Sequence, residues 1–298
     1  MPTFDLDLLD PKQRHGMLLG AVGPRPIALV ATMNAEGALN VSPFSFFNIF
    51  STTPPIVIFS PSRRVRDNTT KDTLENVLQV PECTINMVNY DLAHQVNLSS
   101  AEYASHIDEF KKAGFTPMPS QTIGVPFVKE SPVSLECIVK EVVELGSSGG
   151  SGNLVICEVK TVHVKDEVLD DDGLLNQEAL DLVGRMGRAW WTRSSGDSLF
   201  TLGAPTAGIG VDQLPPAIRR STVLTGNNIA QLAGVLHLPE PEEVAQKSGE
   251  FEIKRLLQNS PDAVERREAL HELAKSLLDE GQVEEAWKVL LIDKGVHN

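Results

Sequence analysis

The chain has 298 residues, a formal net charge of −14 and 41% hydrophobic residues, which is enough apolar material for one large or two ordinary domains. Lysine and arginine form no stripe along it, and this argues against nucleic-acid binding, because phosphate neutralisation requires clustered cations. No apolar stretch approaches the roughly 20 residues that cross a bilayer, so no membrane association is expected. The acidic N-terminus lacks the features of a signal peptide, and a cytoplasmic location is therefore expected.

A short helix is predicted over 11–19, followed by several strands. The strand segments are β-branched or apolar, and turn residues such as those at 34–37 and 53–55 separate them. Strands are predicted over 25–33, 41–50, 55–60, 83–89, 133–145, 153–165 and 199–203. No G-x-G-x-x-G sequence follows a strand, so a Rossmann dinucleotide site is not supported.

Two helical segments interrupt these strands. The first covers 71–79, where Thr70 or Asp72 can act as the N-cap, and the second covers 91–97 and continues through 101–112. Many strands with only local helices favour a mainly β fold, a closed antiparallel barrel, over a doubly wound sheet. The first predicted domain spans residues 1–204.

Three cysteines, Cys83, Cys137 and Cys157, lie inside apolar runs without C-x-x-C spacing. This arrangement is typical of buried free thiols in a reducing compartment. The seven histidines show no metal-ligand spacing, so no metal site is predicted.

Residues 205–298 form a predicted connector and C-terminal helical extension. A brief helix covers 227–236. A longer one begins with Ser260 as N-cap and Pro261 at the first helical position, and ends at Gly281. A second helix over 283–291 completes a helical hairpin that is expected to pack on the barrel or on a partner subunit.

Polar side chains alternate with aromatic ones between residues 40 and 48. Asn40, Ser42, Ser45 and Asn48 supply amide and hydroxyl groups, and three phenylalanines, one of them Phe46, lie among them. Such a surface suits a planar cofactor whose ring stacks on apolar groups while its edge needs donors and acceptors. The alternative is an irregular edge strand that Pro43 interrupts.

The order of motifs around this segment resembles the flavin reductase-like, FMN-binding split-barrel family. The resemblance rests on Pro24-Arg25-Pro26-Ile27-Ala28, the 40–48 segment, Ser60-Pro61-Ser62-Arg63, Lys71-Asp72-Thr73 and Val183-Gly184-Arg185-Met186-Gly187. It covers about residues 10–200. It implies a Greek-key antiparallel split β-barrel with peripheral helices that works as a homodimer.

The resemblance also implies a set of FMN contacts. Residues with hydroxyl or cationic side chains at a helix start would hold the phosphate: Ser60, Arg63, Lys71 and Thr73, with Asp72 orienting Lys71 or capping the helix. Residues matching positions that line the ring and ribityl chain are Thr32, Asn40, Ser42, Pro43, Ser45, Phe46, Asn48 and Arg185. The alternatives are a solvated loop capping an ordinary helix, and hydrogen bonds within turns and strand edges.

The implied function is an FMN-dependent oxidoreductase of the NAD(P)H:flavin reductase type, with no catalytic side chain because FMN supplies the redox chemistry. The alternative is a non-enzymatic electron carrier of the flavoredoxin type, for which the charge of −14 suits a basic partner. A barrel without cofactor that serves as a scaffold is a third reading. Where many members have a histidine, this chain has Asn153, after a Gly- and Ser-rich loop expected to border the open ring face. This departure predicts weak NAD(P)H affinity.

Overall fold

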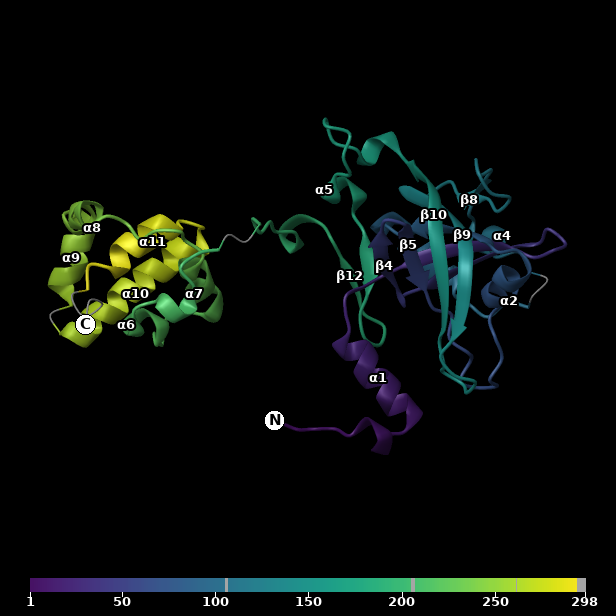
Figure 1. Cartoon of the computed structure of the whole chain (residues 1–298), viewed down its shortest axis with the longest axis horizontal. Helices are drawn as coiled ribbons and strands as arrows, with labels where there is room; N and C mark the ends of the chain where they lie inside the picture. The colour runs from purple at the N-terminus through teal and green to yellow at the C-terminus, as the bar shows by residue number, and fades with distance from the viewer. Residues whose placement is uncertain (105–106, 205–206, 261, 294–298) are drawn as a thin grey trace. The chain divides into compact units, whose positions relative to one another are not determined.

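The computed structural model describes residues 1–104, 107–204, 207–260 and 262–293 (Figure 1). The chain divides into two compact units, Met1–Phe200 and Thr201–Asn298, where the sequence placed the boundary at residue 204. Each unit has its own hydrophobic core. Among the described residues, no helix is both long and apolar enough to cross a bilayer.

A large antiparallel sheet dominates the first unit (Figure 1). Its strand order is β3-β2-β6-β9-β10-β5-β4, and every neighbouring pair is antiparallel. The strands are β2 (Ala28–Met33), β3 (Leu39–Phe44), β4 (Phe47–Thr52), β5 (Pro55–Phe59), β6 (Glu82–Met87), β9 (Val133–Glu144) and β10 (Asn153–Val164). Six of the seven predicted strand segments therefore correspond to strands of the structure.

The two edge strands of this sheet, β3 and β4, are consecutive in the chain and separated only by Ser45 and Phe46. The sheet must therefore curve enough to bring its edges together at this point. The amide of Ser60, just after β5, donates to the carbonyl of Phe46 at 2.8 Å. No backbone ladder joins β3 to β4 in the described part of the chain, so the predicted antiparallel sheet is confirmed but its closure into a barrel is not. With its many helices the chain is mixed and not mainly β.

Two small sheets complete the first unit. The strands β1 (Arg25–Pro26), β11 (Val183–Arg185) and β12 (Trp191–Arg193) form one in that order, and β7 (Pro117–Met118) pairs with β8 (Phe127–Val128). The strand predicted over 199–203 is not formed. Phe200 and Leu202 are exposed there, and no described strand pairs with this segment to satisfy its backbone groups.

Helices cover both faces of the sheet. On β2, Leu29 and Ala31 point into a core shared with α3 (Ala93–Ser99) and α4 (Glu109–Ala113). Their neighbours Ala28 and Val30 point into a second core with α2 (Asp72–Gln79), as the alternation of a strand requires. The remaining helices of this unit are α1 (Pro11–Ala21) and α5 (Gln177–Leu180).

Two expectations about these helices were wrong. The segment 91–112 is not one helix, because α3 ends at Ser99 and Asp108 caps the separate helix α4 by accepting from the amide of Lys111. Residues 105–106 of that segment lie outside the described residues. At α2 the N-cap is Lys71, without a side-chain hydrogen bond, because Asp72 is already helical and the Thr70 hydroxyl donates to Glu75.

The three cysteines are buried and free, as predicted. They lie on the neighbouring strands β6, β9 and β10, where Cys83 pairs in register with Cys137. The sulfur atoms of Cys83 and Cys157 are 3.8 Å apart.

The second unit is helical and packs around Trp287, whose indole N–H donates to the carbonyl of Leu232 at 3.0 Å. Its helices are α6 (Pro216–Arg219), α7 (Gly226–Ala233), α8 (Pro241–Ser248), α9 (Phe251–Asn259), α10 (Ala263–Asp279) and α11 (Val283–Leu290). The cap of α10 is Asp262, which accepts from two amides of the first turn, and not Ser260; Pro261 lies outside the described residues. Helices α6, α8 and α9 were not predicted.

Candidate functional site

Three adjoining cavities run through the first unit. The inner cavity, of about 90 Å³, lies between β3, the start of α2 and the segment after α3. The middle cavity, of about 150 Å³, shares Ser100 with it and is lined by Pro43, Ser45 and Val96. The outer cavity, of about 620 Å³, shares Arg185 and Trp191 with the middle one.

A chain of buried polar side chains forms one wall of the inner cavity. The Thr73 hydroxyl donates to Asn40 Oδ1 at 2.9 Å, and Asn40 Nδ2 donates to Glu109 Oε1 at 3.0 Å. Deeper in the sheet, Asn76 Nδ2 donates to Thr32 Oγ1 at 3.0 Å. All of these residues are buried, so their mutual hydrogen bonds are what make this polar cluster tolerable in the core.

Lys71 is one of two cations in the lining of the inner cavity, and it is half-buried. Its ammonium nitrogen lies 4.9 Å from the centre of the Phe44 ring, and no described carboxylate forms an ion pair with it. Burial, and then the charge of Arg64, lower the pKa of the Lys71 ammonium. A desolvated ammonium without a partner is a site that an anion would stabilise. The Arg64 guanidinium donates to the Thr69 hydroxyl at 3.1 Å and to the carbonyl of Thr70.

Glu109, the first residue of α4, also lines this cavity. It is only 6% exposed, and its Oε2 has no hydrogen-bond partner in the protein. Burial raises the pKa of the Glu109 carboxyl, and the charge of Asp72 adds to this effect. The lining of the inner cavity therefore combines two cations with three carboxyl groups, those of Asp72, Glu102 and Glu109. Burial favours the neutral form of the Glu109 carboxyl.

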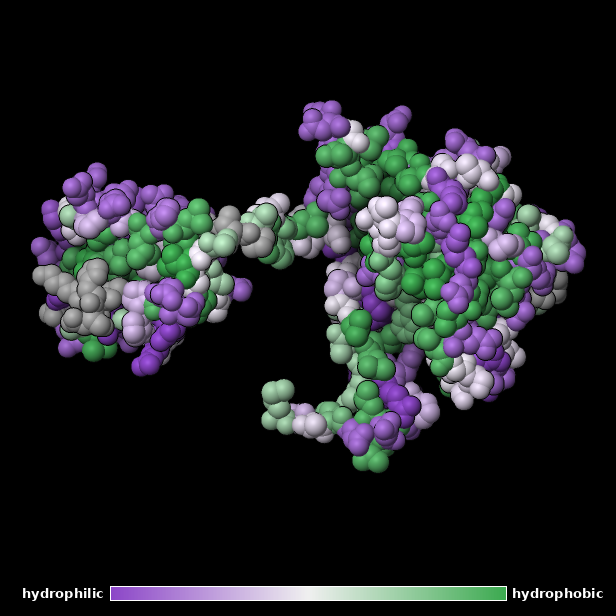
Figure 2. All heavy atoms as spheres, in the orientation of Figure 1, coloured by the Kyte–Doolittle hydropathy of each residue, from purple (hydrophilic) through white to green (hydrophobic). Residues whose placement is uncertain are grey.

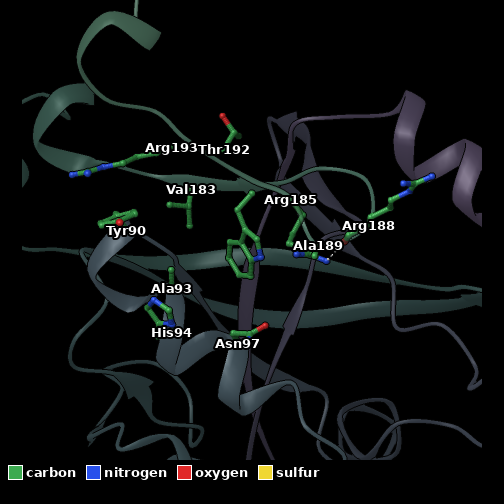
Figure 3. A pocket seen from close by; sticks show the side chains of 11 residues that line it. Tyr90, Ala93, His94, Asn97, Val183, Arg185, Arg188, Ala189, Thr192 and Arg193 are labelled. Atoms are coloured by element: carbon green, nitrogen blue, oxygen red, sulfur yellow. Dashed lines mark hydrogen bonds between the residues drawn. The ribbon is translucent and has the colours of Figure 1, made fainter.

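Two cation–aromatic pairs border the outer cavity, which lies between α3 and the β11–β12 hairpin (Figure 3). The Arg185 guanidinium carbon is 5.0 Å from the Trp191 ring centre, and that of Arg193 is 4.0 Å from the Tyr90 ring centre. Arg193 also holds Asp181 with two hydrogen bonds of 2.7 Å. Arg185 donates to the carbonyl of Arg188 at 3.0 Å.

The model of the flavin reductase like domain matches residues 21–181 of this chain. The chain belongs to this family. The resemblance that its motifs carry is thereby confirmed. The match covers the large sheet and the inner cavity, whereas the lining residues between 183 and 193 of the other two cavities lie beyond it.

Proteins similar to this flavin reductase-like chain match its first unit. An uncharacterised protein of Aquifex aeolicus is 35% identical over 183 residues, which are 61% of this chain and 91% of that protein. The nitrilotriacetate monooxygenase component B of Bacillus cereus is 27% identical, with a TM-score of 0.63 over 68% of this chain and 98% of its own. The 2-nitrobenzoate 2-nitroreductase NbaA of Pseudomonas fluorescens is also 27% identical, with a TM-score of 0.61 over 70% and 100%.

The structure brings most of the predicted cofactor residues of this family member together. Those that line the inner cavity are Asn40, Ser42, Lys71, Asp72 and Thr73. Those that line the middle cavity are Pro43, Ser45 and Arg185.

Five predicted residues lie elsewhere. Thr32 is buried in the sheet, and Asn48 is exposed and accepts from the amide of its neighbour Ile49. Arg63 is turned to Asn68, donating to its side chain at 2.8 Å and to its carbonyl at 2.7 Å. Ser60 is buried against Gly152, where a Cβ atom would lie 2.6 Å from the Ser60 hydroxyl.

The fifth residue, Phe46, lines a separate cavity of about 620 Å³ together with α1, Val65 and the loop residues 148–151. This peripheral cavity is therefore where the Gly- and Ser-rich loop lies. No residue of this loop lines any of the three adjoining cavities, and its expected place at the open ring face stays a prediction.

Seven lining residues of the inner cavity were missed: Arg64, Ser99, Ser100, Ala101, Glu102, Tyr103 and Glu109. Arg64 adjoins the predicted Arg63, and sequence alone does not tell which of two successive arginines turns inward. The Ser-Ser pair at the end of α3 was a usable signal, because two hydroxyls at a helix end can contact a ligand. Glu109 carried no signal, since it appears as one more charge in an acidic segment.

Proposed function

We propose that the first unit binds FMN along the three adjoining cavities and acts as a flavin-dependent oxidoreductase. The observation that carries this proposal is Lys71, a half-buried ammonium in the lining of the inner cavity that forms no ion pair with a described carboxylate. The phosphate of FMN is an anion that could form an ion pair with Lys71. Arg64 and the free amides at the start of α2 would share the phosphate with Lys71.

The middle cavity has the composition that a flavin ring needs. Pro43, Val96 and Trp191 offer apolar contact, while Ser45, Asn97 and Arg185 offer hydrogen-bond groups. When bound, FMN supplies the redox chemistry, and the protein holds and orients it and controls access of water. The similarity to a monooxygenase component and to a nitroreductase supports a redox role.

The proposal is tested on the purified protein. Bound or added FMN should give a flavin spectrum with shifted maxima, and the affinity for riboflavin should be lower by at least about tenfold, because one charge-assisted contact contributes roughly 1.5–3 kcal/mol. Equal affinities for FMN and riboflavin would contradict the phosphate site. Absence of binding for both would exclude the proposal.

Anaerobic addition of NADH or NADPH then separates the two roles. Reduction of FMN by either nucleotide, with turnover on free flavin, supports a reductase. If FMN is tightly bound and is reduced only by dithionite or a protein donor, the result supports an electron carrier of the flavoredoxin type. Saturation at low micromolar NADH would contradict the weak NAD(P)H affinity that Asn153 predicts.

We further propose that the first unit forms a homodimer and that its sheet closes as a split barrel. Edge strand β4 exposes Ile49 and Phe50 at 61% and 64%, and the nearby Phe46 is also exposed. Exposed apolar side chains of this kind favour burial against another chain. The Ser45–Phe46 connection between the two sheet edges supports the split-barrel form. Figure 2 shows further apolar side chains along α1.

A further inference from the structure

The outer cavity carries positive charge in an acidic protein. Its lining contains three arginines and a histidine but no aspartate or glutamate, although the chain as a whole has a net charge of −14. We propose that this cavity binds a planar aromatic carboxylate and that Arg185 is its anion-binding group. The position of this ligand beside a flavin rests on the proposed function, whereas the binding itself does not.

The three arginines are not equivalent. Arg193 is neutralised by its paired hydrogen bonds to Asp181 and stacks on Tyr90. The side chain of Arg188 is exposed and extends away from the cavity (Figure 3). Arg185 remains, and no described carboxylate forms an ion pair with it.

Arg185 is also restrained in a way that favours a planar anion. Its guanidinium lies over the Trp191 ring and donates one hydrogen bond to the carbonyl of Arg188. A guanidinium has five N–H donors, so others remain for a ligand. Two parallel N–H groups match the two oxygens of a carboxylate, and a guanidinium held by stacking loses little entropy when it binds.

The rest of the lining suits an aromatic ring. Tyr90 and Trp191 provide aromatic faces, and Ala93, Val183 and Ala189 provide small apolar contacts. Figure 3 shows Tyr90, His94 and Asn97 facing Val183 and Arg185 across the cavity. His94 and Asn97 can hydrogen-bond to a ring substituent. The volume of about 620 Å³ lies within the range of small-molecule sites, roughly 300–1,000 Å³.

The location of Arg185 connects the proposed anion site with the proposed flavin site. This residue lines the middle cavity as well as the outer one. A carboxylate held by Arg185 would therefore lie at the junction with the space assigned to the flavin ring. Tyr90 and His94, in contrast, line only the outer cavity, so they would contact the far side of the ligand.

The test compares benzoate with its neutral isostere benzamide by isothermal titration calorimetry on the full chain. The wild-type protein should bind benzoate at least about tenfold more tightly, because only benzoate forms a charge-assisted contact. This comparison needs no variant, so a folding defect cannot confuse it. Equal affinity for the two probes overturns the inference.

Two substitutions on the β11–β12 hairpin test whether Arg185 causes the preference for benzoate. Arg185→Gln should abolish the preference for benzoate, whereas Arg188→Gln, which removes the same charge from a side chain directed away, should retain it. An equal loss in both variants would show a general electrostatic effect and would overturn the assignment to Arg185. Circular dichroism of both variants confirms that they are folded.

Adding FMN separates this inference from the proposed function. If the benzoate preference is present and FMN does not bind, the anion site stands and the flavin proposal fails. If FMN binds while benzoate and benzamide bind alike, the flavin proposal stands and the anion site fails.

Discussion

The hydroxyl of Thr73 donates to the side-chain oxygen of Asn40 at 2.9 Å, although the two residues lie 33 positions apart in the sequence. Thr73 is the second residue of helix α2 and Asn40 belongs to strand β3. The hydrogen bond therefore fixes the helix start against the sheet edge that forms the inner cavity. Both residues were predicted as cofactor contacts, and the structure shows that they also contact each other.

Replacing Thr73 by valine tests this relationship. Valine keeps the shape of threonine but leaves Asn40 Oδ1 without its main donor, which costs about 1–3 kcal/mol for a buried group. The free energy of unfolding, measured with urea, should fall by that amount. Thr73→Ser restores the hydroxyl and should lose clearly less; equal losses in the two variants would show that packing and not the hydrogen bond is at work.

The phosphate site predicts a contrast between two adjacent arginines. Arg64→Gln and Lys71→Gln should each weaken FMN binding by at least about tenfold, since each removes a charge-assisted contact. Arg63→Gln is the matched control, because Arg63 is bonded to Asn68 and does not line the inner cavity. Fluorescence titration with FMN and riboflavin measures both affinities. A larger loss for Arg63→Gln than for Arg64→Gln would contradict this placement.

Glu109 should make the protein less stable at neutral pH than at acid pH. Burial raises its folded-state pKa above the ordinary 4.5, so folding favours the protonated form. The contribution of Glu109 is therefore fully present below pH 4.5 and is lost as the pH rises through the folded-state pKa. Glu109→Gln keeps an acceptor for Asn40 and should remove this pH dependence. Parallel stability curves for the two proteins between pH 4 and 8 would contradict it.

Glu136 should act with the opposite sign. Burial alone would raise its pKa, but hydrogen bonds from Thr122, Gln121 and His163 lower it to about 2. Its contribution is therefore present above the ordinary value of 4.5 and is lost as the pH falls toward 2. Glu136→Gln should flatten the loss of stability between these pH values, measured by urea unfolding. An unchanged slope would show that other carboxylates control acid unfolding.

The proposed dimer depends on the apolar edge strand β4. Light scattering should give about twice the chain mass of 32.4 kDa, and Ile49→Asp should shift the protein to a monomer. Leu174→Asp is the control, since Leu174 is similarly exposed at 66% but lies in a turn away from β4. A wild-type mass near 32 kDa would contradict the dimer.

The sequence could predict most of the strands, because short apolar or β-branched segments such as 28–33 and 133–144, bounded by turn residues, favour strands. It could not predict the break between α3 and α4. Tyr103, Ile107 and Phe110 follow helical spacing, but the chain ends one helix at Ser99 and starts another after Asp108. Spacing alone does not report where tertiary packing interrupts a periodic segment.

The sequence could predict which motifs form the candidate site, but not which individual residues of each motif line it. The motif Lys71-Asp72-Thr73 was found because it combines a cation, a hydroxyl and a helix start. Thr32 and Ser60 match the same family pattern but are enclosed by the protein, and only the packing of neighbouring strands decides this. Glu109 contributes from a different segment, through a contact that no local pattern encodes.

The three cysteines all lie in the first unit, and their reactivity can be used to measure how often that unit unfolds. The hydrogen bond with Cys83, and then burial, raise the pKa of the Cys137 thiol, so little reactive thiolate forms in the folded state. The second unit, from Thr201 onward, contains no cysteine. The rate of cysteine alkylation, followed by mass spectrometry, would therefore report transient unfolding of the first unit alone. Unfolding of the helical unit would not change this rate, because that unit has no thiol to react.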